Sequence, residues 1–270
     1  YGILKFINFA HGEVFMLGAF FGFYIAKFLG VDSPSVTMAL VILLLTMSGT
    51  AIVGITIEKL AYKPLRNSSK LTVLITAIGV SLFLQYSGQL VFGADPKSFP
   101  TIIENTSFSI LGATIGTNQI VVLVSALLLM VLLRIIVFRT RMGIAIRAVS
   151  NNMTAASLMG ININNIISFT FAIGSSLAGA AGILYSINYP SIDPLMGLLP
   201  GLKAFIAAVL GGIGNFPGAV VGGVLIGLVE TFTVGYLSPT YRDAIAFAIL
   251  ILILLIKPTG LFGKKEVEKV

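Results

Sequence analysis

Seven long apolar stretches fill most of this 270-residue chain. A helix that crosses a lipid bilayer needs about 20 mostly apolar residues. Backbone N–H and C=O groups in lipid must bond within the segment, so helices are the expected form. The pattern predicts an all-α, polytopic transmembrane helix bundle, and the short first and last stretches are expected to extend into their flanks. The stretches are Val14–Leu29, Val36–Ile57, Leu71–Phe92, Asn118–Phe138, Ile166–Ile187, Leu202–Thr233 and Ala244–Ile256.

The charge content points the same way. Hydrophobic residues make up 57% of the chain and charged residues 10%, and the mean hydropathy is +1.03. Soluble domains average about 25% charged residues, so this chain cannot cover the surface of a water-soluble globule of its size. There is no Cys, and His11 is the single His. An intramembrane enzyme or a metal site would have almost no reactive groups, so we expect no catalytic residue, no metal and no cofactor.

Basic residues gather in three segments between or after the apolar stretches. The positive-inside rule places all three in the cytoplasm, so the C-terminus is expected there. The net charge of +7 is thereby explained by topology, and we expect no nucleic-acid partner. The three segments hold twelve of the 17 basic residues: Lys59, Lys63, Arg66 and Lys70; Arg134, Arg139, Arg141 and Arg147; Lys257, Lys264, Lys265 and Lys269.

This orientation constrains the segment Leu202–Thr233, which must enter and leave the membrane on the same side. Its middle, residues 211–218, reads GGIGNFPG, and such a cluster of Gly and Pro breaks helices. We expect a re-entrant hairpin or two helices bent around Gly211–Gly218. Irregular backbone at membrane depth is tolerated where it lines a cavity, which makes Gly211, Gly212 and Gly214 candidates for the substrate pathway. The alternative is one continuous kinked helix.

Small residues recur at four-residue spacing in two stretches, Gly174–Gly182 and Gly218–Gly227. In a membrane, small side chains let helix backbones approach closely, where no hydrophobic force drives association. The spacing predicts tight helix packing and says little about chemistry.

The segment Arg139–Asn165 is long for a connection between two spans and contains no Pro. Its apolar residues recur at three- and four-residue steps, which predicts a short amphipathic cytoplasmic helix ended by Gly160. The helix could dock in a groove of a soluble partner or rest on lipid headgroups. The expected apolar face is Ala145, Val149, Met153, Ala156 and Met159, and the polar face is Arg147, Ser150, Asn151, Thr154 and Ser157.

Four motifs in the chain resemble those of one family, the permease subunits of branched-chain amino-acid ABC importers. They cover nearly the whole chain in the family's order, and the first and third are specific in combination. They are NFAHGE at residues 8–13 with MLGA at 16–19, TAASLMGI at 154–161, GGIG through PGA at 211–219, and KPTGLFG at 257–263.

This resemblance implies that residues 1–270 are one permease domain of an importer in a bacterial or archaeal cytoplasmic membrane. Its expected partners are a second, similar permease, two cytoplasmic ATPase subunits and an external substrate-binding protein. The family usually has one more helix before Asn8, so an N-terminal helix is expected to be missing. The motif match carries ATPase coupling to residues 139–165, with Arg147, Asn151, Ala155, Ala156, Ser157 and Gly160 as contact candidates.

Asn8, His11 and Glu13 are polar groups at the start of the first apolar stretch. Ionisable groups at membrane depth are functional candidates, so these residues are assigned to the substrate pathway. The alternative is a structural role, in which His11 caps or bridges helices and contacts no substrate. Glu230 is expected to pair with Arg242 at the interface or to belong to the pathway.

Two other functions stay open from the sequence. The chain could be an autonomous secondary transporter or channel, or a urea or amide permease of the same family. An amphipathic cytoplasmic helix favours the importer, because a pore that works alone needs no docking element.

Overall fold

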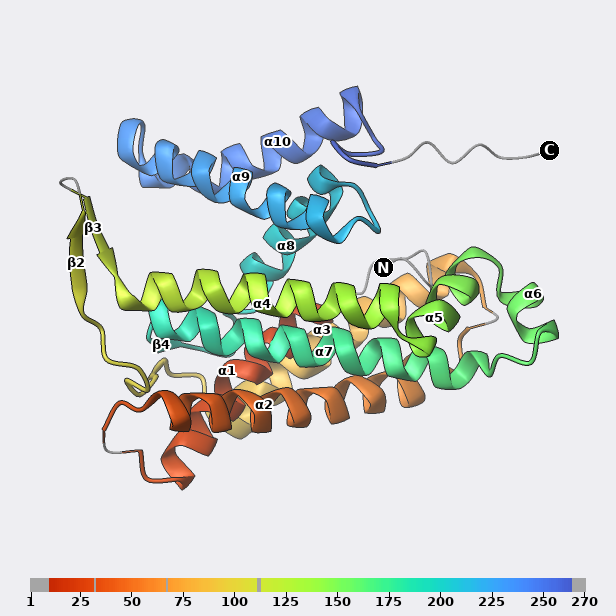
Figure 1. Ribbon diagram of the computed structural model, residues 1–270, viewed down its shortest axis with the longest axis horizontal. Coiled ribbons are helices and arrows are strands. Elements are labelled where there is room, and N and C mark those ends of the chain that lie inside the picture. Colours follow the sequence, from red (N-terminus) through yellow and green to blue (C-terminus); the bar gives the residue numbers. More distant parts are fainter. Residues whose placement is uncertain (1–9, 32, 67, 111–112, 264–270) are drawn as a thin grey trace. The chain divides into compact units, whose positions relative to one another are not determined.

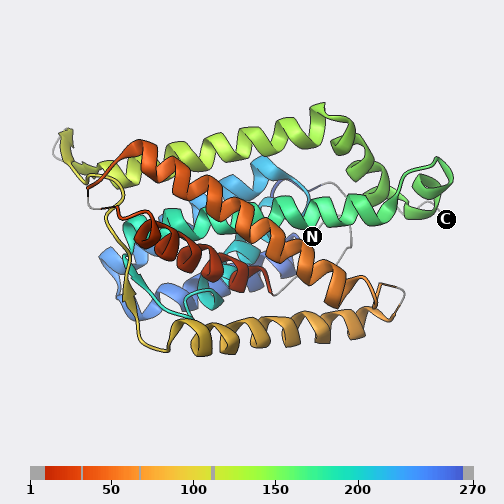
Figure 2. The same ribbon diagram turned by 90° about the horizontal axis from the view of Figure 1, so that it is seen from below.

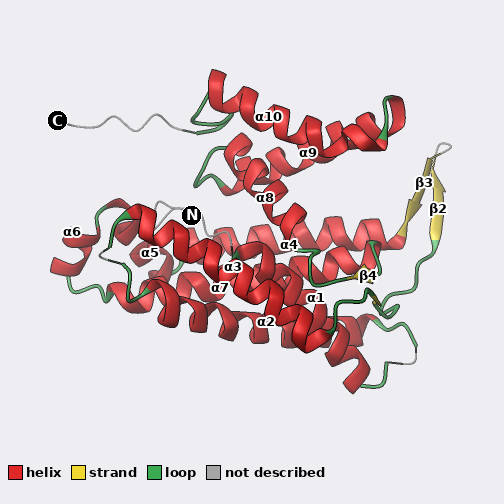
Figure 3. Cartoon of the chain, turned by 180° about the vertical axis from the view of Figure 1, so that it is seen from behind, coloured by secondary structure: helices red, strands yellow, loops and turns green. Residues whose placement is uncertain are grey.

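The structure is a computed structural model that describes residues 10–31, 33–66, 68–110 and 113–263 (Figure 1). The described residues are mostly helical, as Figure 3 shows, and the predicted all-α class is confirmed. They divide into an N-terminal unit that ends at Leu198 and a C-terminal unit that starts at Leu199.

Six helical segments in the described part of the chain are long and apolar enough to cross a membrane. Five of them coincide with a predicted apolar stretch to within five residues at each end. The remaining segment, Phe216–Tyr236, covers only the second part of Leu202–Thr233, whose first part belongs to the shorter helix Leu198–Gly211. The first stretch forms a helix of 18 residues that lies outside these six. The six are Val36–Tyr62, Leu71–Phe92, Thr117–Arg139, Ile163–Asn188, Phe216–Tyr236 and Pro239–Ile256.

The described part of the N-terminal unit contains five long helices. A π-helical turn, η1 (Glu58–Tyr62), extends the second of them. Two short helices, α5 (Arg141–Asn151) and α6 (Met153–Leu158), connect the fourth to the fifth. The long helices are α1 (His11–Phe28), α2 (Val36–Ile57), α3 (Lys70–Phe92), α4 (Thr117–Arg139) and α7 (Ile163–Asn188). Three of them, α2, α4 and α7, run lengthwise in Figure 1, and α4 and α7 also do so in Figure 2.

The described strands lie at the end of this unit opposite α5 and α6 (Figure 3). They form two antiparallel pairs, β1 (Lys97–Ser98) with β4 (Ser191–Ile192) and β2 (Ser107–Ile110) with β3 (Ala113–Gly116). The strand pairs therefore lie at one end of the unit, and α5 and α6 lie at the other.

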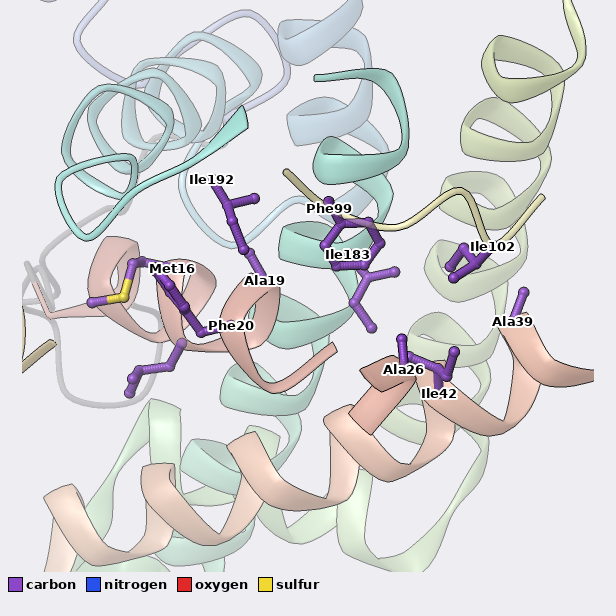
Figure 4. Close-up of a cluster of buried hydrophobic side chains, with 11 residues drawn as sticks. Met16, Ala19, Phe20, Ala26, Ala39, Ile42, Phe99, Ile102, Ile183 and Ile192 are labelled. Atoms are coloured by element: carbon purple, nitrogen blue, oxygen red, sulfur yellow. The ribbon is translucent and has the colours of Figure 1, made fainter. Parts of the chain in front are cut away.

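Helix α7 is the element against which α1 and α2 pack. Gly18 of α1 lies against the backbone of Gly179, and Gly54 of α2 lies against Ser175. The predicted close packing through small residues is confirmed at Ser175, Gly179 and Gly182. Large apolar side chains of α1, α2, α7 and the strand end fill the remaining space, among them Phe20, Ile42, Phe99 and Ile183 (Figure 4).

The C-terminal unit contains α8 (Leu198–Gly211), α9 (Phe216–Tyr236), the 3-10 turn η2 (Pro239–Tyr241) and α10 (Arg242–Ile256). The predicted break is confirmed, and the continuous kinked helix is wrong. The Asn215 side chain ends the turn by accepting a hydrogen bond from the N–H of Gly218 at 3.1 Å, as an N-cap residue does.

Gly182 on α7 provides a test of the packing account. A methyl group there would overlap the carbonyl oxygen of Phe15, whereas one at Gly174 on the same helix would meet nothing within 4 Å. We predict that Gly182→Ala lowers stability by about 1–3 kcal/mol through overpacking. Gly174→Ala should be neutral or raise stability by up to about 1 kcal/mol, because Ala favours helix. Thermal unfolding of the two variants in detergent measures the difference, and equal melting temperatures would contradict the account.

Candidate functional site

The connection from α4 to α7, residues 140–162, is built from successive helix caps, and we call it the coupling loop. The Thr140 hydroxyl accepts a hydrogen bond from the N–H of Gly143 at 3.1 Å and begins α5. The Asn152 side chain accepts one from the N–H of Ala155 at 2.9 Å and begins α6. The Asn162 side chain accepts one from the N–H of Asn165 at 3.3 Å and begins α7. Each such cap contributes about 1 kcal/mol, so the local sequence specifies the shape of the loop.

The expected single amphipathic helix is wrong, because Asn152 divides the segment into α5 and α6. This residue has extended backbone angles of φ −150° and ψ 106°. Its N–H closes α5 by donating to the carbonyl of Ala148 at 3.0 Å, while its side chain opens α6. The signal was present in the sequence, since Asn is among the strongest N-cap residues.

Gly160 ends α6 as predicted. Its φ of +82° is a conformation that Gly adopts without strain. The N–H of Ile161 donates to the carbonyl of Ala156 at 3.1 Å, and the N–H of Gly160 donates to that of Ser157 at 2.9 Å. These two bonds define a Schellman motif, which turns the chain sharply away from the helix axis.

Helix α6 lies at the far end of the loop (Figure 1). The turn after it leaves two large apolar side chains exposed. Leu158 and Met159 are each 83% exposed, and we call this pair the coupling tip. Met159 was expected on the same face as Val149 and Ala156, but only those two are buried, at 1% and 4%. The early end of α6 explains the error, because helical spacing does not extend to Met159.

The six coupling candidates fall into two groups. Five of them are exposed, as the coupling tip is: Arg147, Asn151, Ala155, Ser157 and Gly160. Ala156 is buried within the chain. The Arg147 guanidinium carbon lies 5.2 Å from the centre of the Phe138 ring on α4, which holds α5 against the end of that span.

Two basic segments meet at this end of the N-terminal unit. Arg66, in the connection from η1 to α3, donates a hydrogen bond to the Asn164 side chain on α7 at 2.6 Å. Arg66 also pairs with Glu58 at 2.6 Å, and the Ser168 hydroxyl donates to the other oxygen of Glu58 at 2.6 Å. Glu58 is fully buried. Sequence reasoning missed this cluster, because its members are up to 110 positions apart.

The pathway candidates lie in different places. Asn8 is outside the described residues, and His11 is the first residue of α1. Glu13 is 1% exposed, and one of its oxygens accepts a hydrogen bond from Ser81 on α3 at 3.2 Å. Its other oxygen, Oε2, has no hydrogen-bond partner within the described residues.

The glycines of the break have close neighbours in the C-terminal unit. Gly211 lies against Gly218, and Gly212, at φ +98°, lies against Gly263. The N–H of Leu261 donates to the carbonyl of Leu210 at 2.8 Å. The segment after α10 is thus hydrogen-bonded to the end of α8, next to the turn between α8 and α9. Gly214 has φ +89°, a conformation that Gly adopts without strain and other residues do not, although a Cβ there would meet nothing within 4 Å.

A second charged cluster joins the three helices of the C-terminal unit. The expected pair of Glu230 with Arg242 is confirmed at 2.8 Å. Lys203, which the sequence did not single out, lies 2.8 Å from Glu230 and 2.7 Å from Asp243. The ammonium group of Lys203 on α8 thus lies between carboxylates of α9 and α10.

These features define a polytopic helical membrane protein with an exposed apolar tip at its basic end. A family model described as the permease component of the branched-chain amino acid transport system matches residues 1–254. The chain belongs to this family of permease components. It is therefore a transport subunit and not an enzyme.

Named relatives agree with the family match. The high-affinity branched-chain amino acid transport system permease proteins BraD of Pseudomonas aeruginosa and LivH of Escherichia coli K12 are each 42% identical to it. Each of these matches covers 100% of this chain and 90% of the relative. A probable LivH of the archaeon Methanocaldococcus jannaschii is 30% identical over 95% of this chain and 82% of its own length. No solved structure matches the chain.

Proposed function

We propose that the chain is the permease subunit of an ATP-driven importer that carries branched-chain amino acids across the cytoplasmic membrane. The names of the relatives support the substrate class. The observation that carries the mechanism is the coupling tip, where Leu158 and Met159 project from the basic end. Large apolar side chains at such exposure are typical of a surface that a partner covers.

The proposed occupant of the tip is a cytoplasmic ATPase subunit. A short helix that places apolar side chains in a groove is a recurring mode of recognition, and the tip has this form. Exposed Arg147, Asn151 and Ser157 would lie at the rim of such a contact, where polar groups fit. Closure of two ATPase subunits on ATP would then move the coupling loop and change which side of the membrane the pathway opens to. A second permease subunit and an external substrate-binding protein complete the proposed assembly.

The proposed pathway includes the start of α1. Glu13 supports this assignment, because one oxygen of its buried carboxylate has no hydrogen-bond partner among the described residues. Such an oxygen is costly unless something else binds there. The α-ammonium group of an amino acid is a chemically suitable partner. His11, Gly211, Gly212 and Gly214 are further candidates on the same proposal.

The coupling tip gives the first test. We predict that the double variant L158D/M159D lowers co-purification of the ATPase subunits at least tenfold, which corresponds to about 1.4 kcal/mol. Charge at a desolvated contact costs more than that amount. The control is Phe108→Asp on β2, which alters an apolar side chain of 52% exposure at the opposite end of the same unit. Retention of the ATPases by the double variant, or their equal loss in the control, would refute the docking role.

The proposed orientation gives the second test. Because the 270 residues contain no Cys, single introduced thiols can be labelled without background. Ser157 on α6 and Glu104 near the strand end are both exposed. We predict that a membrane-impermeant maleimide labels Glu104→Cys in intact cells and labels Ser157→Cys only after the cells are opened. The reverse pattern would place the coupling tip outside and exclude a cytoplasmic ATPase as its partner.

A further inference from the structure

Four polar side chains connect α7 to the end of α2, and we call them the Glu58 cluster. They are Glu58 on η1, Arg66 in the following connection, and Asn164 and Ser168 on α7. Three contacts of 2.6 Å join them: Arg66 Nη2 to Glu58 Oε1, Ser168 Oγ to Glu58 Oε2, and Arg66 Nη1 to Asn164 Oδ1. Both carboxylate oxygens of Glu58 are therefore satisfied from two different directions.

The carboxylate at the centre of the cluster is buried, and its cationic partner is largely buried. The side chain of Glu58 is 0% exposed and that of Arg66 is 17% exposed. Replacing a buried ion pair by apolar residues of similar volume is often neutral or stabilising, so such a pair is weak evidence for a stabilising role. The cluster does provide geometric specificity. Its short, charge-assisted hydrogen bonds fix the position of the end of α2 relative to α7.

The two sides of the cluster differ in their surroundings. On one side, Asn164 and Ser168 lie on the first two turns of α7, directly after the coupling loop and its cap at Asn162. On the other side, Glu58 begins the π-helical turn, where the N–H of Lys63 donates to the carbonyl of Glu58 at 2.7 Å. Such π-helical turns interrupt the regular α-helix ladder and occur frequently at functional sites.

We propose that the Glu58 cluster transmits movement of the coupling loop to α2 and, through the Arg66 connection, to α3. This inference rests on the proposed function, because it assumes that an ATPase moves the loop. Glu58 and Arg66 are positioning residues in this role and contact neither substrate nor nucleotide. Because α7 continues directly from the loop, displacement of its first turns draws Glu58 with them through Ser168 and Asn164.

The test uses the complete transporter reconstituted in liposomes, with the rates of leucine uptake and ATP hydrolysis measured on the same sample. We predict that Glu58→Gln lowers the leucine transported per ATP at least about fivefold, the smaller end of typical coupling effects. The matched control is Glu230→Gln, which alters a buried carboxylate with two cationic partners in the C-terminal unit. If Glu58 had only a structural role, both variants would give less folded protein. The leucine transported per ATP would then stay unchanged in both.

A milder pair of variants keeps the test decisive if Glu58→Gln folds poorly. Asn164 and Asn165 are both exposed neighbours on α7, but only the Asn164 side chain bonds to Arg66. We expect Asn164→Ala to lower the transport ratio and Asn165→Ala to leave it unchanged. Equal ratios in all variants would overturn the role of the cluster alone. Failure of the unaltered complex to couple uptake to ATP would overturn the proposed function, and the inference with it.

Discussion

Helix α7 meets α1 and α2 at distances that only small side chains permit, and the N-terminal unit depends on these contacts. In lipid, helices gain little from the hydrophobic effect by associating, so van der Waals contact between backbones has to hold them. Gly18 against Gly179, and Gly54 against Ser175, provide that contact. The same helix begins where the coupling loop ends, so the element packed closely against α1 and α2 is also the one attached to the exposed tip.

Polar interactions are concentrated where the helices end. The caps at Thr140, Asn152 and Asn162 set the path of the coupling loop. The Glu58 cluster then joins the start of α7, where the loop ends, to the end of α2. In the C-terminal unit, Lys203 lies between Glu230 and Asp243 and joins α8 to α9 and α10. Apolar spans thus supply the membrane-crossing length, while short polar contacts determine how their ends are held. A permease that changes conformation needs both, because rigid spans can transmit a displacement only through defined contacts at their ends.

Hydropathy and helix-breaking residues predicted most of the fold. Span lengths follow from apolar runs, and the break at Gly211–Gly218 follows from Gly and Pro, so both could be read locally. The pairing of Glu230 with Arg242 was also predictable, because the two residues are twelve positions apart across one turn. The division of the coupling loop at Asn152 was missed, although the capping preference of Asn is a local signal.

Other features had no local signal. Glu58 with Ser168 and Lys203 with Glu230 pair residues that the chain brings together only after its helices have packed. A single sequence shows such residues as isolated charges in apolar surroundings and does not identify their partners. The partner of Lys203 could not be chosen from sequence, since Glu230 and Asp243 both lie in later helices. The roles assigned to His11, Glu13 and the glycines of the break stay predictions for the same reason.

The central claim is that this chain imports amino acids only when an ATPase works on its coupling loop. The most direct measurement is uptake of radiolabelled leucine into liposomes that contain the chain, its partner permease and the ATPase subunits, with the substrate-binding protein supplied outside. We predict accumulation against a gradient that requires ATP on the side of the coupling tip and stops when ATP is replaced by a non-hydrolysable analogue. Equal uptake by the chain alone, driven by an ion or solute gradient without ATP, would contradict the account and identify an autonomous transporter.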